Sequence, residues 1–224
     1  MVKFVISYSG GKDSVLALHQ LQAAGNEPVA LLVMMNREQK RSWFHGIEMP
    51  IWVDVSEALN LPLIFCETGD DSYEEVLENG LRQAKAMGAQ ACAFGDIDIE
   101  DHLQWNCRRC EAAGLQPLHP LWHINRRECV ETFLRLGYKA MIKCVQNDVT
   151  PVDLLGEFLD LPILHRLEDL GLDACGENGE YHTFVLDGPL FQHPVAVEKG
   201  EILRLQYATV LDLHSAREES APEE

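Results

Sequence analysis

Near the N-terminus the sequence reads Ser9-Gly10-Gly11-Lys12-Asp13-Ser14, between two apolar segments. The preceding run, Val2–Ile6, is short and rich in β-branched residues, which is typical of a buried strand. The following segment repeats valine and leucine at helical spacing as far as Gly25, which predicts a helix that ends there. A strand, a glycine turn and a helix in this order form a cradle for an anion, because the free N–H groups at the start of the helix point at it. Lys12 adds a mobile cation, and Ser9 and Ser14 add hydroxyl groups.

The spacing separates this cradle from two common phosphate sites. A Walker A loop would need glycine and serine or threonine where Ile6 and Asp13 stand. The Gly-x-Gly-x-x-Gly pattern of dinucleotide sites is also absent after the strand. Ser-Gly-Gly-x-Asp-Ser resembles the signature of the PP-loop ATP pyrophosphatases, which split ATP between the α and β phosphates. A glycine turn that is merely capped by serine is the alternative.

Composition indicates a globular protein without a membrane span. The chain has 224 residues, of which 46% are apolar and 24% charged, and no run of eighteen apolar residues occurs. The first residues enter a core strand directly, without the pattern of a signal peptide. Seven cysteines, an odd number, are typical of reduced thiols, so we expect a cytoplasmic protein. Cys107 and Cys110 form a single Cys-x-x-Cys pair, which is weak evidence for metal or redox use.

The charge balance argues against nucleic acid as a partner. The net charge is −18, from 36 acidic and 18 basic residues, so the surface repels polyanions at long range. We therefore expect no binding to membranes or nucleic acid, and we consider a homodimer as one possible assembly.

Alternating apolar runs and helical patterns predict an α/β fold with a parallel sheet. The first half carries expected strands at 29–35, 63–66 and 89–94, and expected helices at 51–59, 72–87 (with Asp70–Ser72 as its cap) and 101–113. The second half carries expected helices at 126–136, 154–159 and 163–170, and expected strands at 140–145 and 183–186. We place a PP-loop domain at 1–122, a smaller α/β domain at 123–214 and a frayed acidic tail at 215–224.

Two further segments follow expected strands, where open α/β sheets bind ligands. Gly95-Asp96 comes directly after the strand at 89–94. Asp96 either orients Mg²⁺ or the nucleophile, or caps the next helix. Residues 36–50, which include Trp43, form either a lid over a nucleotide or an ordinary surface loop.

A second polar constellation occupies residues 175–191. Glu177, Asn178, Glu180 and His182 stand among glycines there, ahead of a strand-like segment. Such a density of polar groups on a glycine-rich turn is either solvated or used. If used, its carboxylates can hold an ammonium ion or a metal, and His182 can shuttle a proton.

Together these motifs resemble the diphthine–ammonia ligase (diphthamide synthase) family of PP-loop ATP pyrophosphatases. The matching segments, in order, are 9–14, Gly95-Asp96, Pro117–Trp122 and Gly176–Tyr181 through Phe191. The resemblance runs from residue 2 to about residue 195. It implies an adenine nucleotide alpha hydrolase-like (Rossmann-like) domain followed by a smaller family-specific domain. Members use ATP to adenylylate a carboxylate, which ammonia then converts to an amide.

The resemblance also implies roles for individual residues. ATP would be bound by Ser9, Gly10, Gly11, Lys12, Asp13, Ser14, His45 (which follows Phe44 in the family's aromatic–histidine pair) and Gly95. Catalysis would rest on Lys12, Asp13 and Asp96, with Asp13 and Asp96 on Mg²⁺. The acceptor would lie against Glu177, Asn178, Glu180, His182 and Thr183.

Two departures bear on the substrate. Eukaryotic members have glycine in place of Asn178 and glutamate in place of His182, and the longer ones carry further C-terminal domains. The form seen here resembles the prokaryotic branch. The acceptor would be diphthine on elongation factor 2 where the host makes diphthamide, and another carboxylate elsewhere.

Three functions follow from these residues. The first is an AMP-forming ligase that uses ATP, ammonium and a carboxylate. The second is a PP-loop enzyme that modifies tRNA, against which the acidic surface counts. The third is a sensor that binds an adenine nucleotide without turnover, against which the Lys12-Asp13 pair counts.

Overall fold

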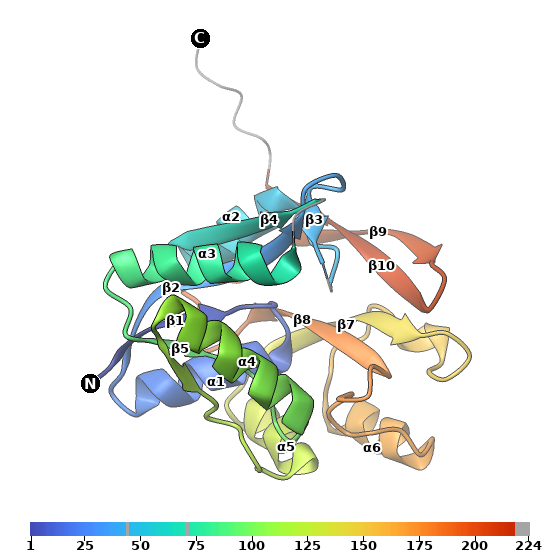
Figure 1. The fold of residues 1–224 in the computed structure, drawn as a ribbon. Helices are drawn as coiled ribbons and strands as arrows, with labels where there is room; N and C mark the ends of the chain where they lie inside the picture. Colours follow the sequence, from blue (N-terminus) through green and yellow to red (C-terminus); the bar gives the residue numbers. More distant parts are fainter. Residues whose placement is uncertain (44, 70–71, 218–224) are drawn as a thin grey trace.

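The fold contains two sheets of different kinds, shown in Figure 1. The structure is a computed structural model, which describes residues 1–43, 45–69 and 72–217. Phe44, Asp70 and Asp71 of the sequence analysis therefore lie outside the described residues. Sheet A contains β1 (Lys3–Ser7), β2 (Glu27–Asn36), β3 (Arg41–Ser42), β4 (Leu63–Thr68), β5 (Ala91–Ala93) and β6 (Gln116–Leu118). Sheet B contains β7 (Lys139–Gln146), β8 (Tyr181–Asp187), β9 (Val197–Arg204) and β10 (Ala208–Ser215).

Sheet A is the predicted parallel sheet. Its parallel strands run in the order β4-β2-β1-β5-β6, and only the short β3 pairs antiparallel, with the end of β2. The chain builds outward from β1 to β2 and β4, and then crosses to β5 and β6 on the other side of β1. The order therefore reverses between β1 and β5. Ligands of open α/β sheets bind at such a point, outside the carboxyl ends of the strands.

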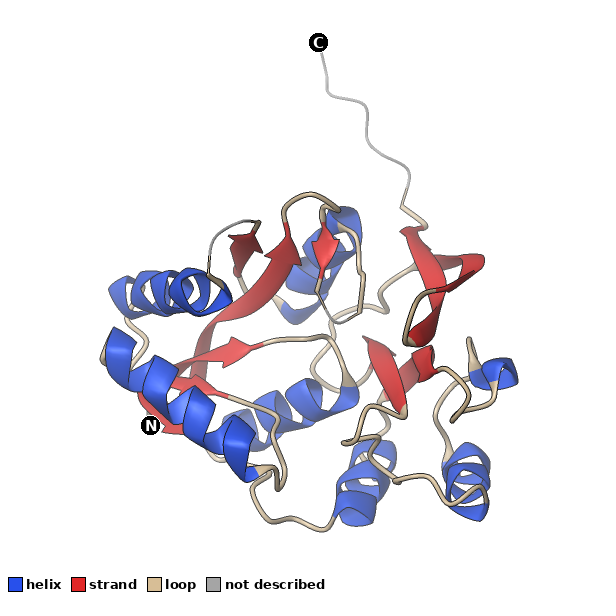
Figure 2. Cartoon of the chain, turned by 45° about the vertical axis from the view of Figure 1, so that its right-hand side comes forward, coloured by secondary structure: helices blue, strands red, loops and turns tan. Residues whose placement is uncertain are grey.

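Helices cover both faces of sheet A and flank sheet B (Figures 1 and 2). They are α1 (Lys12–Ala23), α2 (Met49–Leu59), α3 (Tyr73–Ala86), α4 (Glu100–Ala113), α5 (Arg126–Arg135), the 3₁₀ turn η1 (Val152–Leu154) and α6 (Leu161–Asp169). Apolar side chains of α3 and α4 form one core with one face of the sheet. Those of α1, α2, α5 and α6 form a second, larger core that continues into sheet B. No helix in the described part of the chain combines the length and apolar character that a membrane span requires.

The phosphate loop is held by sheet B as well as by sheet A. The N–H of Val185 on β8 donates to the carbonyl of Gly10 at 2.8 Å, and the N–H of Lys12 donates to the Thr183 hydroxyl at 3.1 Å. Gly10 has φ +78°, and a Cβ there would lie 2.5 Å from the Phe184 ring. Glycine is therefore required at position 10 both for the turn and for the packing of β8.

Most elements lie where the sequence predicts them, but the helix expected at 154–159 is wrong. Only the 3₁₀ turn Val152–Leu154 forms there, and Gly156 has φ +82°, which ends it. The following residues run beside β7 instead, with Phe158 bridged to Met141. Strands β9 and β10 were not expected. Of the tail expected at 215–224, Ser215 is the last residue of β10, and 218–224 lie outside the described residues.

Candidate active site

A cavity of about 300 Å³ lies at the carboxyl ends of β1 and β5, where the strand order reverses. Residues from both halves of the chain line it. The expected site residues along its wall are Ser9, Gly11, Lys12, Asp13, Ser14, His45, Gly95, Asp96, Glu177, His182 and Thr183. The structure thus brings the phosphate loop and the glycine–glutamate segment together, although about 170 residues separate them.

The phosphate loop fits an anionic ligand. Helix α1 starts at this cavity, and its N-cap residue Gly11 makes no side-chain capping hydrogen bond. The orphan N–H groups of a helix start are a ready anion site. The Ser9 hydroxyl lies 3.2 Å from that of Ser14, so both hydroxyls stand beside these groups. This geometry suits the phosphates of a nucleotide.

Gly95 allows the loop after β5 to approach α1 closely. A Cβ at position 95 would lie 2.8 Å from the carbonyl carbon of Asp13 and 2.9 Å from the nitrogen of Ser14. Backbone atoms cannot yield as a flexible side chain can. The glycine before Asp96 is therefore needed to bring the two strand ends together, and the contact sets Asp96 beside the phosphate loop.

Lys12 is the cation of the cavity, and it is only 4% exposed. Its ammonium donates to the carboxylate of Asp13 at 2.9 Å and to the carbonyl of Cys175, and it lies 5.3 Å from the centre of the Tyr181 ring. Burial alone would lower the pKa of Lys12, but Asp13, Tyr181 and Cys175 raise it well above its usual value. The side chain is therefore a permanent positive charge.

Three carboxyl groups gather around this charge. Asp96 accepts from the side-chain amide of Asn106 at 2.8 Å and lies 3.2 Å from Nδ1 of His102. Burial raises the pKa of Glu177 to about 7, and repulsion from Asp13 and Asp96 adds to this. Glu177 therefore faces both aspartates across the cavity.

The described residues contain no group of three or more His, Cys, Asp or Glu side chains arranged to hold a metal ion. Mg²⁺ commonly takes one or two carboxylates and completes its shell with water and substrate phosphates. Asp13 and Asp96, the residues expected to hold Mg²⁺, both line the cavity, and Asp13 is also bound by Lys12.

Two histidines stand face to edge at the rim of the phosphate loop. The rings of His45 and His182 have centroids 5.4 Å apart at 88°, and Nε2 of His45 lies 3.5 Å from where a Cβ of Gly11 would be. Burial lowers the pKa of both, and for His45 the neighbouring His182, Lys143 and Lys12 lower it further. Both rings are therefore neutral near pH 7.

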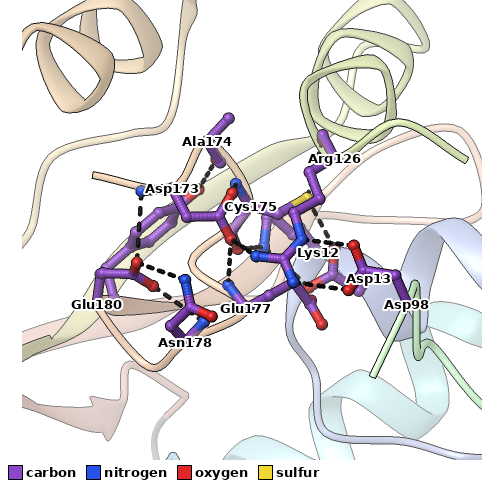
Figure 3. A network of polar contacts seen from close by, with 11 residues as sticks. Lys12, Asp13, Asp98, Arg126, Asp173, Ala174, Cys175, Glu177, Asn178 and Glu180 are labelled. Atoms are coloured by element: carbon purple, nitrogen blue, oxygen red, sulfur yellow. Dashed lines mark hydrogen bonds and ion pairs between the residues drawn. The ribbon is translucent and has the colours of Figure 1, made fainter. Parts of the chain in front are cut away.

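Three expected site residues do not line the cavity: Gly10, Asn178 and Glu180. Glu180 is buried, and its carboxylate accepts from the backbone N–H of Asn178 at 3.1 Å and from the side-chain amide of Asn178 at 3.0 Å (Figure 3). This pair ties the glycine–glutamate turn together and so positions Glu177. The density of polar residues in this turn suggested contact with substrate, but part of it serves hydrogen bonds within the turn itself.

The sequence analysis missed several residues around Lys12. Cys175, Tyr181 and His102 line the cavity. Asp173 accepts from the N–H of Glu177 at 2.8 Å and from the guanidinium of Arg126 at 2.8 Å, which also binds Asp98 (Figure 3). These residues come from four separate segments, so spacing in the sequence could not reveal them.

Asp96 does not cap the next helix. The N-cap of α4 is Ile99, and no side-chain hydrogen bond is made there. Cys107 is partly exposed and Cys110 is buried, and all seven cysteines are free thiols.

Comparison with known proteins places this geometry in one family. The sequence model of the Diphthamide synthase N-terminal domain matches residues 2–117, and that of the Diphthamide synthase C-terminal domain matches residues 125–218. The chain is similar to the human protein named Diphthine--ammonia ligase, with 28% identity over 92% of this chain and 90% of that protein. The zebrafish protein of the same name is 28% identical over 86% of this chain and 85% of its own length.

The relative of that name from Schizosaccharomyces pombe is 26% identical over 87% of this chain but only 36% of its own length. The two domain matches follow one another along the chain, as the phosphate loop and the glycine–glutamate segment do around the cavity. The chain belongs to the diphthamide synthase family.

Proposed function

We propose that the protein is an ATP-dependent, AMP-forming ligase that adenylylates an acceptor carboxylate and converts it to an amide with ammonia. The observation that carries this proposal is one cavity in which the start of helix α1, a buried lysine and several carboxyl groups meet. The name Diphthine--ammonia ligase, shared by the relatives described above, supports the same chemistry.

In the first step a carboxylate oxygen of the acceptor attacks the α-phosphorus of ATP, and the bond to the β-phosphate oxygen breaks. The phosphate loop (Ser9–Ser14) would bind the phosphates through its N–H and hydroxyl groups. Lys12 would stabilise the charge that develops on the leaving pyrophosphate. Mg²⁺ on Asp13 and Asp96 would neutralise phosphate charge when bound.

In the second step the nitrogen of ammonia forms the amide bond, and the bond from the acyl carbon to AMP breaks. Ammonium must first lose one proton, and the attacking nitrogen loses a second one to the solvent as AMP leaves with the oxygen of the broken bond. Glu177, with its pKa raised to about 7, is poised to bind the ammonium and accept the first proton, and neutral His182 can pass it on. We place the ammonium ion, as the substrate on this wall, against Glu177, His182 and Thr183, and keep Asn178 and Glu180 as the support of that wall.

We assign nucleotide binding to residues 1–122 and the acceptor side to residues 123–214. The seven free thiols favour the cytoplasm as the site of action. Where the host makes diphthamide, we propose diphthine on elongation factor 2 as the acceptor. Asn178 and His182, which stand where the eukaryotic members have glycine and glutamate, resemble the prokaryotic branch, and in a host without diphthamide we propose a different carboxylate as the acceptor.

The first experiment is to measure pyrophosphate release from ATP with Mg²⁺ and ammonium, with and without diphthine-bearing elongation factor 2. Release and amidation that require the factor would establish the relatives' reaction here. Release that requires another carboxylate would move the assignment to that acceptor. Tight binding of ATP or AMP with no pyrophosphate release under any condition would contradict the ligase proposal and favour a nucleotide sensor.

Lys12→Ala separates ligase from sensor. We expect turnover to fall by about 10²–10³-fold with a smaller loss of ATP affinity, because Lys12 acts on charge that develops in the reaction. Lys12→Met keeps the buried stem and guards against misfolding, and Lys3→Ala, on an exposed ion pair, is the control. Equal losses of ATP affinity and turnover would argue against a catalytic role.

A further inference from the structure

A second cavity, of about 460 Å³, adjoins the active site and shares His45 with it. Its polar wall comes from β3, β7 and β10, with Arg41, Lys143 and Asp212. Its apolar wall includes Trp43, Leu203 and Leu205. We call it the Lys143 chamber. The proposed function does not use it.

Lys143 is an unusual residue for the centre of a strand. Its side chain is 1% exposed and lines the chamber, and no hydrogen bond or ion pair joins its ammonium to another described residue, although Asp212 is near enough to act on it electrostatically. Burial lowers the pKa of Lys143 to about 8, and Arg41 contributes, while Asp212 opposes the change. An ammonium taken out of water without a partner costs free energy. Lys12, the other buried lysine, has partners for its ammonium. The unused N–H donors of Lys143 are therefore a specific feature of the chamber.

The neighbouring charges pair with one another and leave Lys143 as the cation that faces the chamber. Asp212 is already engaged by Arg41 at 2.6 Å and lies 3.3 Å from Nε2 of His214. Arg41 also lies 3.7 Å from the carboxylate of Glu48, so Arg41 and Asp212 are both engaged with other charged groups, whereas no ion pair joins Lys143 to another described residue. The chamber therefore favours an anion.

The chamber also lies next to the phosphate loop. The Lys143 ammonium lies 3.8 Å from the position that a Cβ of Gly46 would take. The next residue along the chain towards the N-terminus is His45, and its Nε2 lies 3.5 Å from the position that a Cβ of Gly11 would take. At the rim, Trp43, Leu203 and Leu205 are 46%, 42% and 56% exposed. Exposed apolar side chains around a buried cation suit a ligand with an anionic head and an apolar stem.

We propose that the Lys143 chamber is the binding site of the acceptor substrate, with the acceptor's carboxylate on the Lys143 ammonium and its apolar stem along Trp43, Leu203 and Leu205. This assignment rests on the proposed function, because it names the acceptor's site for that reaction. Lys143 is a binding residue here: it orients the carboxylate beside the phosphate loop, and no bond to it is made or broken.

Calorimetric titration without ATP or ammonium tests the proposal on the full chain. The probe is 4-phenylbutyrate, with its neutral amide, 4-phenylbutanamide, and inorganic phosphate as comparison ligands. We expect the carboxylate to bind wild type and to bind Lys143→Met roughly tenfold or more weakly, as for the loss of a charged hydrogen-bond donor. The amide should bind both proteins equally weakly.

Lys139→Met is the matched control, because Lys139 lies on the same strand with an exposed side chain and should leave the affinity unchanged. Unaltered ATP binding, and cooperative thermal unfolding at the wild-type temperature or above it, would show that Lys143→Met is folded, since removal of the buried charge should not destabilise it. Equal carboxylate affinity in wild type and Lys143→Met, or no carboxylate binding at all, would overturn the proposal. Preference for phosphate over the carboxylate would overturn it as well, in favour of a phosphate subsite.

The titration also separates the two proposals. Because it needs no turnover, carboxylate binding at Lys143 would stand even if pyrophosphate release were never found. Conversely, ligase activity together with a carboxylate affinity that does not change in Lys143→Met would contradict only the proposal for the Lys143 chamber.

Discussion

Two residues of the active site, Lys12 and Glu177, differ in how firmly the fold fixes their charge. Lys12 is buried with its charge fully paired, whereas Glu177 is half-buried beside like charges and has its pKa raised to about 7. The first arrangement keeps a permanent cation next to the phosphate loop. The surroundings of Glu177 give a carboxyl group that changes its charge near neutral pH. Glu177 therefore makes the stability of the apoprotein depend on pH.

Glu177→Gln should remove that coupling. The folded protein holds the proton up to about pH 7, while the unfolded chain releases it near its ordinary pKa of 4.5. The wild type therefore loses stability between these values as pH rises, and Gln does not. We expect the two proteins to be equally stable below about pH 4.5, and Glu177→Gln to be more stable by roughly 1–2 kcal/mol above pH 7.

The measurement is denaturant unfolding across this range, with chelator and without nucleotide. Glu111→Gln, on an exposed position of α4, serves as the control for loss of one surface charge. A stability difference for Glu177→Gln that stays constant from acid to alkaline pH would contradict the assignment.

Among the elements, α2 is fastened to the C-terminal segment through one buried carboxylate. Asp54 is 1% exposed and accepts from the N–H of Ala196 at 3.1 Å. His193 lies 3.0 Å away, and Arg217 lies 2.5 Å away. The end of the described chain is thereby held against the larger core.

Asp54→Ala should loosen this attachment. The N–H of Ala196 would lose its acceptor, and we expect the free energy of unfolding to fall by about 1–3 kcal/mol. Hydrogen exchange should increase over residues 193–217. Glu57→Ala, which removes only an exposed ion pair with Arg217, should cost less than about 1 kcal/mol. Equal effects of the two substitutions would show that the buried carboxylate is not the anchor.

The elements also show which sequence signals suffice. The strand, loop and helix at residues 3–23 could be predicted, because the spacing of the apolar residues and the glycine turn indicate the same boundaries there. Strand β9 was missed, because most of its side chains are exposed and no alternation marks a buried face. The helix expected at 154–159 failed, because Gly156 turns the chain beside β7.

The site was predictable where each motif is continuous. Ser9–Ser14, Asp96 and Glu177 reach one cavity because each follows or faces a strand end of sheet A. Cys175 could not be foreseen, since its placement depends on how the segment before β8 packs on the phosphate loop. His102 could not be foreseen either, because it reaches Asp96 from within α4 rather than from a motif. Lys143 resembled an ordinary strand residue in the sequence, and only the tertiary structure leaves its charge without a partner.

On the scale of the whole molecule, charge discriminates between partners. With a net charge of −18, the protein should not bind tRNA at physiological ionic strength. A gel-shift titration with bulk tRNA checks this, and a basic tRNA-binding protein provides the positive control. Salt-sensitive binding in the micromolar range or tighter would revive the tRNA-modifying alternative.

The fastening of the phosphate loop by β8 has a consequence for synthesis. The hydroxyl that accepts from the Lys12 N–H lies 171 residues further along the chain. At ribosomal speeds this stretch takes on the order of ten to thirty seconds to make. During that time the nascent N-terminal half carries an ATP signature whose loop lacks its partner strand. We expect nucleotide affinity to arise late, as the final third of the chain leaves the ribosome, so an unfinished chain would not consume ATP.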